Sequence, residues 1–373
     1  MTASRRVIVF ILCAFIAISM TVTVPSGAPV STASAGGARR HLPSVGAQFH
    51  ATWAYDTHKQ RVRMLNKLKR AGVRWVRIDV GWNSLQEDGR NGYERWYVRQ
   101  LSRIVRAARN RNLKVMATFW GSPYWARADH SRAGPPRRLR DYGRAVRYLA
   151  KRFRGRISAY EIWNEPNHPD YWTKGPGRYA DMLRIAYKKI NDVAPRAKVV
   201  SGATSMNDYH WIAKMLRAGG RNHYDVMATN GYTAPANLRP EAPYNGTIYR
   251  MASVKQVHRV MVRHHDGRKP IWFGEFGWSS HKNNGNEENW ELGVSKRKQA
   301  RYLVRALKFL GCRFPYVKRV FWYMEKNRRV GQRASKMDIQ RANYGLLKPD
   351  MRRKPAYRAL DNLMEGPDRL RNC

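Results

Sequence analysis

Eight short runs of β-branched and aromatic residues alternate along the chain with longer segments of helical periodicity, and this alternation limits the possible folds most. The runs cover residues 44–49, 74–81, 113–119, 157–163, 198–202, 225–229, 270–276 and 317–323. Between them, apolar residues such as Val98, Leu101 and Val105 recur at helical spacing. Strands separated by helices indicate parallel βαβ units, and eight such units predict a closed (β/α)₈ TIM barrel of the α/β class.

An open, doubly wound sheet is the competing architecture, but no glycine-rich phosphate-binding turn follows the first strand. A (β/α)₈ barrel typically takes about 250 residues. We therefore expect one catalytic barrel over residues 43–365, with elaborated loops after the strands and no second domain. Residues 366–373 are expected to form a C-terminal tail.

The N-terminus has the layout of a secretory signal peptide. Arg5 and Arg6 precede an apolar run at 7–20, and small residues at 33–35 offer a cleavage site. The sequence predicts that residues 1–35 are removed on export, which leaves a secreted or cell-wall-associated protein with no membrane span. An uncleaved anchor is the alternative, because residues 7–24 are almost long enough to cross a bilayer.

Export would permit a disulfide bond between the two cysteines that follow the signal segment. Our hypothesis is a Cys312–Cys373 bridge, and the alternative is two free thiols.

Two glutamates stand at the ends of the fourth and seventh predicted strands. Glu165 lies in a Trp-Asn-Glu-Pro stretch at 163–166, and Glu275 lies in a Phe-Gly-Glu-Phe stretch at 273–276. The carboxyl ends of barrel strands form the active face. A carboxylate after a buried run is costly unless it is partnered or functional, so ion pairs with arginine are the alternative. Paired carboxylates, one protonated and one ionised, suit glycoside hydrolysis, and retention requires them about 5–5.5 Å apart.

The triplet Asn164-Glu165-Pro166 with Glu275 resembles the clan A retaining glycoside hydrolases, of the family five and family thirty-nine type with a cellulase-like barrel. The resemblance covers about residues 45–363. It implies that Glu165 is the general acid/base, that Glu275 is the nucleophile, and that Asn164 binds the 2-hydroxyl of the sugar at the cleaved bond. It also implies mostly β-linked substrates and no metal or organic cofactor.

Other positions match the family less completely. Arg77 resembles the strand-two arginine that holds the nucleophile ionised, and Trp322 resembles the aromatic floor beside the cleaved bond. Tyr232 resembles a tyrosine that contacts the nucleophile, although Asn230 stands where the family pattern has histidine. Glu161 is as well suited to neutralising Arg77 as to any other role.

Aromatic and histidine side chains after the first and third strands are further candidates for substrate binding. His50 and Trp53 follow the first strand, and Trp125 follows the third in a stretch of family character. Trp53, Trp125 and Trp290 suit core or lid positions equally well. Asp79 receives no role.

The chain is strongly basic, with 71 Lys and Arg against 26 Asp and Glu and a net charge of +45. Such an excess predicts attraction to anionic polymers or surfaces. DNA binding is the rival use of this charge, but no motif for specific nucleic-acid recognition accompanies it.

The sequence thus predicts a secreted, monomeric retaining glycosidase that acts on a polysaccharide or oligosaccharide. We expect endo action, on an acidic polymer or beside an anionic cell surface. The alternatives are a non-catalytic cationic wall- or polysaccharide-binding protein on the same barrel, and a cationic protein that binds nucleic acid or surfaces.

Overall fold

Eight parallel strands form the central sheet of the computed structural model, which describes residues 41–53, 56–129 and 134–366. The strands are β1 (Ser44–Gln48), β2 (Trp75–Gly81), β3 (Lys114–Trp120), β4 (Ala159–Asn164), β5 (Lys198–Ala203), β6 (Met227–Thr229), β7 (Ile271–Phe276) and β8 (Val317–Trp322). Their order is β5-β4-β3-β2-β1-β8-β7-β6. Parallel bridges from Val200 to Val226 and from Thr204 to Thr229 join β5 to β6, so the sheet closes. The predicted (β/α)₈ barrel is confirmed.

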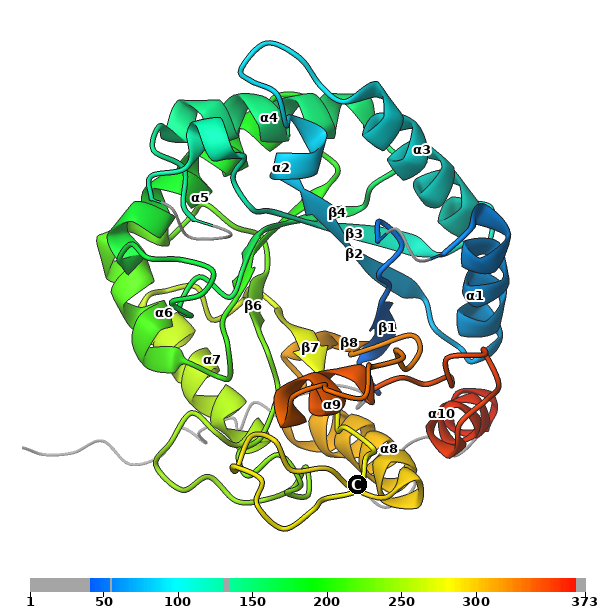
Figure 1. Cartoon of the computed structure of the whole chain (residues 1–373). Coiled ribbons are helices and arrows are strands. Elements are labelled where there is room, and N and C mark those ends of the chain that lie inside the picture. Colours follow the sequence, from blue (N-terminus) through cyan, green and yellow to red (C-terminus); the bar gives the residue numbers. More distant parts are fainter. Residues whose placement is uncertain (1–40, 54–55, 130–133, 367–373) are drawn as a thin grey trace, which may run out of the picture. The chain divides into compact units, whose positions relative to one another are not determined.

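Helices surround the barrel (Figure 1). They are α1 (His58–Arg70), α2 (Trp82–Leu85), α3 (Arg95–Arg109), α4 (Leu139–Arg152), α5 (Pro176–Asn191), α6 (Tyr209–Met215), α7 (Val254–Arg263), α8 (Lys296–Arg313), α9 (Lys336–Ala342) and α10 (Pro355–Glu365). Local sequence explains several of their starts. Thr57 and Gln60 form a reciprocal capping box at α1, and proline opens α5 and α10.

Apolar side chains fill the interior of the barrel. Trp75, Met116 and Trp272 belong to this inner core. The Arg319 guanidinium lies between the two indole rings. Its Cζ is 4.0 Å from the ring centroid of Trp75 and 4.2 Å from that of Trp272. The interior is tight enough near the site to require a glycine. A Cβ atom on Gly274 would lie 2.7 Å from the Cβ of Ala203.

The predicted signal peptide at residues 1–35 lies outside the described residues. So does Cys373 of the predicted Cys312–Cys373 bridge, although Cys312 is itself disulfide-bonded. Among the helices that the structure describes, none is both long and apolar enough to span a membrane.

Candidate active site

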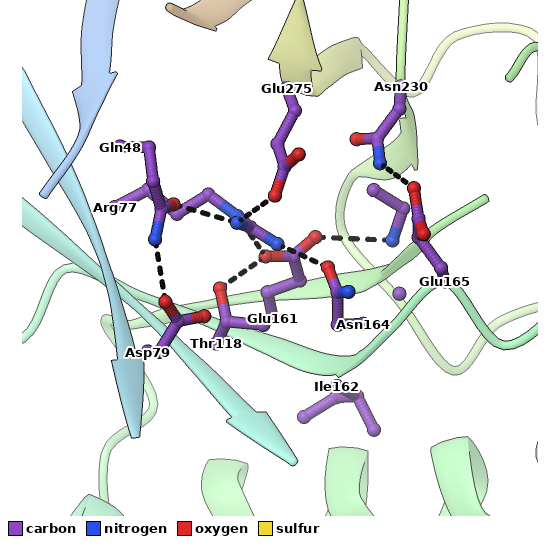
Figure 2. A network of polar contacts seen from close by, with 12 residues as sticks. Gln48, Arg77, Asp79, Thr118, Glu161, Ile162, Asn164, Glu165, Asn230 and Glu275 are labelled. Atoms are coloured by element: carbon purple, nitrogen blue, oxygen red, sulfur yellow. Dashed lines mark hydrogen bonds and ion pairs between the residues drawn. The ribbon is translucent and has the colours of Figure 1, made fainter. Parts of the chain in front are cut away.

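Arg77 on β2 lies at the centre of a network that joins four strands (Figure 2). Its guanidinium is fully buried. Nε donates to Oε2 of Glu161 on β4 at 2.7 Å, and Nη1 donates to Oε1 of Glu275 on β7 at 2.7 Å. Nη1 also donates to Gln48 on β1, and Nη2 donates to Asn164 at 2.8 Å. The carboxylate charges raise the pKa of Arg77 although burial lowers it, so the guanidinium is a permanent cation.

Glu161 is the structural partner of that cation. Its side chain is completely buried. Oε2 also accepts from the Thr118 hydroxyl at 2.5 Å, and Oε1 accepts from the backbone N–H of Ala203 at 3.1 Å. Because these contacts leave Glu161 walled in by the barrel, its carboxylate neutralises Arg77 and does not face the solvent. The sequence left this pairing open.

Glu275 combines the ion pair to Arg77 with access to solvent. Its side chain is 14% exposed. The Tyr232 hydroxyl donates to its second oxygen, Oε2, at 2.9 Å. Burial raises the pKa of Glu275 to about 7, against the opposing effect of the Arg77 cation. Both contacts supply hydrogens to the carboxyl group, and both therefore stabilise its ionised form.

Glu165 has a different environment. Asn230 donates to Oε1 of Glu165 at 2.7 Å through its side-chain amide, and no ion pair to Glu165 occurs within the described residues. Burial raises the pKa of Glu165. Strand β4 turns sharply here, because Trp163 and Glu165 have positive φ angles of 75° and 43°. Such angles are strained for residues other than glycine and often mark functional sites.

The two carboxyl groups affect each other, since the charge of Glu165 raises the pKa of Glu275. A pair of this kind loses its protons in two shared steps. When one proton remains, the charge is best placed on Glu275, which accepts from Arg77 and Tyr232. Glu165 accepts from a neutral amide, so these contacts favour Glu165 as the site of the remaining proton.

Both glutamates open into one large cleft of about 1740 Å³. The ends of β1, β2, β4, β7 and β8 and residues around α9 line it. His50 and Glu325 form part of this lining, and Nδ1 of His50 lies 3.0 Å from Oε2 of Glu325. The arrangement can therefore bind a molecule larger than a single sugar ring against both carboxyl groups.

The family model of cellulase, glycosyl hydrolase family 5, matches residues 36–309. The chain belongs to this family. A family 5 enzyme of this kind is a retaining glycoside hydrolase, which acts on a carbohydrate substrate. No curated protein sequence matches the chain significantly.

Solved structures of glycoside hydrolases share the fold of this family 5 chain. A family 39 glycoside hydrolase from Bacteroides cellulosilyticus has a TM-score of 0.67 at 23% identity, and the match covers 86% of this chain and 63% of that one. A family 5 (GH5_18) protein from Streptomyces cattleya, solved with GlcNAc, has a TM-score of 0.62 at 20% identity, covering 87% and 80%. A monomeric β-xylosidase from Caulobacter crescentus has a TM-score of 0.65 at 15% identity, covering 88% and 70%.

Six of the eight site residues expected from the sequence lie together in this family 5 barrel. Arg77, Asn164, Tyr232 and Glu275 are joined by the contacts above. Glu165, which bonds to Asn230, and His50 line the same cleft. Because Arg77 fixes the carbonyl oxygen of Asn164, the Asn164 amide NH₂ is left as a donor toward the cleft.

Trp322 and Trp125 lie elsewhere. Trp322 is completely buried, packs against Phe276 and Trp278, and donates from Nε1 to the Tyr344 carbonyl. Trp125 packs edge-on against Trp82 and donates to the carbonyl of Gln86. Neither belongs to the described lining of the cleft. These placements favour core roles over the sugar-binding roles expected from the sequence.

Several site residues escaped sequence reasoning. Gln48 accepts from Arg77 and donates to Asp79 at 2.7 Å, which links β1 to β2 under the cleft. Tyr323 lines the cleft after β8, and Glu325 holds His50. A polar residue within an otherwise apolar strand was the available signal for Gln48 and Asp79. Within the described residues, no cluster of His, Cys, Asp and Glu side chains has the geometry to hold a metal ion.

Proposed function

We propose that this retaining glycoside hydrolase uses Glu275 as its nucleophile and Glu165 as its general acid/base on β-linked polysaccharides. The observation that carries the assignment is the asymmetry of the two carboxyl groups. Glu275 accepts from the Arg77 cation and from Tyr232, whereas Glu165 accepts from the neutral Asn230 amide. A nucleophile must be ionised before it attacks, and a general acid must hold a proton.

The reaction then takes two displacements. Glu275 attacks the anomeric carbon while Glu165 gives its proton to the departing glycosidic oxygen, which breaks the bond and leaves a covalent glycosyl-enzyme. Glu165, now ionised, removes a proton from water as the water attacks the same carbon. The sugar leaves with its original configuration, and both carboxyl groups return to their starting states. Asn164, held by Arg77, donates to the 2-hydroxyl of the sugar during both steps.

The size of the cleft supports endo action. Pockets for drug-sized ligands have volumes of about 300–1,000 Å³, and the cleft of this chain is about 1740 Å³. It has room for several sugar units on both sides of the cleaved bond. Digestion of a long polymer should therefore lower its viscosity before short products accumulate.

The net charge of +45 supports action at an anionic surface outside the cell, with the basic N-terminal segment serving as an export signal. The enzyme would work as a secreted or wall-associated monomer, and its polymeric substrate or its surroundings would be acidic. Retention on an acidic polysaccharide column should fall steeply as salt rises, because screening weakens such contacts. Retention that is unchanged between low and moderate salt would contradict this part of the proposal.

Substitution of each glutamate tests the assignment of the two catalytic roles. Glu275→Gln should abolish turnover of every substrate. Glu165→Gln should lower turnover by about 10²–10⁴, the usual contribution of a general acid, and should be least harmful when the leaving group is a good one that needs no proton. The matched control is Asp170→Asn, which removes an exposed carboxylate that also lines the cleft. If all variants released product at the wild-type rate, the assignment would be wrong.

A further inference from the structure

A second charged cluster lies in the cleft, on the side formed by the ends of β1 and β8. His50 is buried beside Glu325, which accepts from the backbone N–H of His50 at 3.3 Å and contacts Nδ1 at 3.0 Å. Burial lowers the pKa of His50, but the Glu325 charge and hydrogen bond raise it more, so the net shift is upward. Nδ1–H faces Glu325, and the Glu325 charge favours the imidazolium form of His50, in which Nε2 also carries a proton and can donate into the cleft.

Arg328 completes this cluster. Its Cζ lies 4.8 Å from the centroid of the Trp53 ring, and Trp53 packs against His50 with ring centroids 4.2 Å apart. Nη2 donates to the carbonyl of Arg341 at 3.4 Å, whereas Nε is buried and has no hydrogen-bond partner within the described residues. The guanidinium is thus held in one place by an aromatic face while much of its donor capacity is unused.

Arg328 also differs from its neighbour Lys326 in its charged partners. Lys326, two residues earlier in the cleft wall, is paired with Asp56 at 2.5 Å. Arg328 has no ion pair among the residues that the structure describes, although Glu325 and Asp338 line the same cleft. Glu325 is engaged by His50. Asp338 accepts hydrogen bonds from Ser335 at the start of α9, and the Arg328 charge lowers the pKa of Asp338 without an ion pair between the two. A fixed, unpaired guanidinium in a cleft is suited to an anionic ligand.

The cluster lies beside the nucleophile. Tyr323, whose ring centroid is 5.5 Å from that of His50, has a pKa that burial raises, that the Glu275 charge raises further and that the Arg328 charge lowers. The backbone N–H of Tyr323 donates to the carbonyl of Phe276, the residue after Glu275, at 2.9 Å, so Tyr323 lies beside both the end of β7 and His50. The sugar that becomes attached to Glu275 must rest at this end of the cleft.

We propose that Arg328 and His50 bind the carboxylate of a uronic acid on the glycone side of the cleaved bond, so that the enzyme prefers polyuronides to neutral glycans. The carboxylate would accept from the Arg328 fork and from Nε2 of His50, with its sugar ring beside Tyr323. Such planar, charge-assisted pairing is selective for a carboxylate. This inference rests on the proposed function, because Glu275 defines the glycone side.

The experiment compares β-linked oligouronides of gluco, manno and galacto configuration with carboxyl-reduced counterparts of the same length. The wild type should cleave at least one oligouronide with a kcat/KM about tenfold to a hundredfold above its reduced form, the value of one or two charge-assisted hydrogen bonds. Arg328→Gln should remove this preference mainly through KM. Arg328→Lys should restore part of it, because the charge remains while the planar fork is lost.

Arg329→Gln is the matched control, since it removes the same charge from an exposed neighbour in the same loop. It should change the preference less than twofold, and unchanged thermal unfolding of each variant would show that the barrel is intact. Calorimetric titration of Glu165→Gln with the oligouronides measures binding while turnover is slow, and adding Arg328→Gln should weaken that binding by the same factor.

The outcomes separate the two proposals. Cleavage of reduced or neutral oligosaccharides as fast as oligouronides would overturn the uronate site and leave the proposed function standing. A preference for uronides that survives Arg328→Gln would also overturn the site. Failure to cleave any glycan would overturn the proposed function, and failure of Glu165→Gln to bind any oligouronide would overturn the uronate site independently.

Discussion

Arg77 and Glu275 are joined by an ion pair of 2.7 Å between Nη1 and Oε1, while the same guanidinium holds Glu161 through Nε at 2.7 Å. One cation thus serves two carboxylates. Glu161 is completely buried, and Glu275 is partly exposed in the cleft. In the proposed mechanism, therefore, the structural and the chemical carboxylate of this network are different residues.

Measurements of stability should distinguish the role of Glu161 from that of Glu275. Glu161→Gln removes a partner from a fully buried pair, so we expect the free energy of unfolding to fall by about 3 kcal/mol, the lower end for breaking buried ion pairs. Glu275→Gln should abolish activity with little loss of stability, because Glu275 is partly exposed and Arg77 keeps Glu161 as its ion-pair partner. Urea unfolding of both variants checks this. Equal destabilisation by the two substitutions would contradict the division of roles.

Tyr232→Phe should move the acid limb of the pH–activity profile to higher pH. The nucleophile must be ionised, and the Tyr232 hydrogen bond lowers the pKa of Glu275, which burial raises to about 7. Without the hydroxyl that pKa rises, so activity is lost at a higher pH as the solution is acidified. The profile of kcat/KM, which reports the free enzyme, is the measurement. An acid limb that moved down or stayed in place would disprove the link.

Substitutions of Asn230 test the role of Glu165 through the alkaline limb of the pH–activity profile. The Asn230 amide lowers the pKa of Glu165 against the larger effect of burial. Asn230→Ala should therefore raise that pKa, move the alkaline limb upward, and reduce kcat by about tenfold through loss of positioning. Asn230→His restores the residue of the related families and should keep most of the activity. If Asn230→Ala shifted the acid limb alone, the assignment of Glu165 as the acid would be in doubt.

Lys354 should make stability depend on pH. It is fully buried without an ion pair among the described residues, and it donates to Ser280, Asn327 and the Asn343 carbonyl. Burial lowers its pKa to about 7. Between about pH 7 and the ordinary lysine pKa, the unfolded chain holds a proton that the folded chain lacks, so folding is favoured as pH rises.

The difference in unfolding free energy between the wild type and Lys354→Met isolates this effect. It should grow in favour of the wild type by about 1.4 kcal/mol per pH unit above pH 7. Lys296→Met is a control. Lys296 is an exposed lysine, and its charge also lowers the pKa of Lys354. A difference that does not change with pH would mean that Lys354 keeps its proton in the fold.

The barrel could be predicted because strands such as β7 carry their own signal in short runs of β-branched and aromatic residues. The same reasoning missed α6 and α9, which have seven residues each and little apolar periodicity. Helices this short depend on tertiary contacts more than on local propensity.

The position of the two glutamates in one cleft could be predicted because Glu165 follows β4 and Glu275 lies at the end of β7. The contacts between distant segments could not, since His50 and Glu325 are separated by 275 residues and only the closure of β1 against β8 brings them together. Burial was the other obstacle. The position of Trp322 at the end of the eighth strand resembles that of an aromatic residue that contacts the sugar, but the Trp322 indole is buried in the core.

Gly274 has a consequence for the chemistry as well as for packing. A methyl group there would press on Ala203 and approach an oxygen of Glu161 to 3.1 Å, so strand β7 would have to retreat and take Glu275 with it. The gap between two catalytic carboxyl groups decides whether a glycosidase retains or inverts the anomeric configuration. In the proposed mechanism, the missing methyl group at Gly274 thus helps to set that gap and with it the stereochemistry of the product.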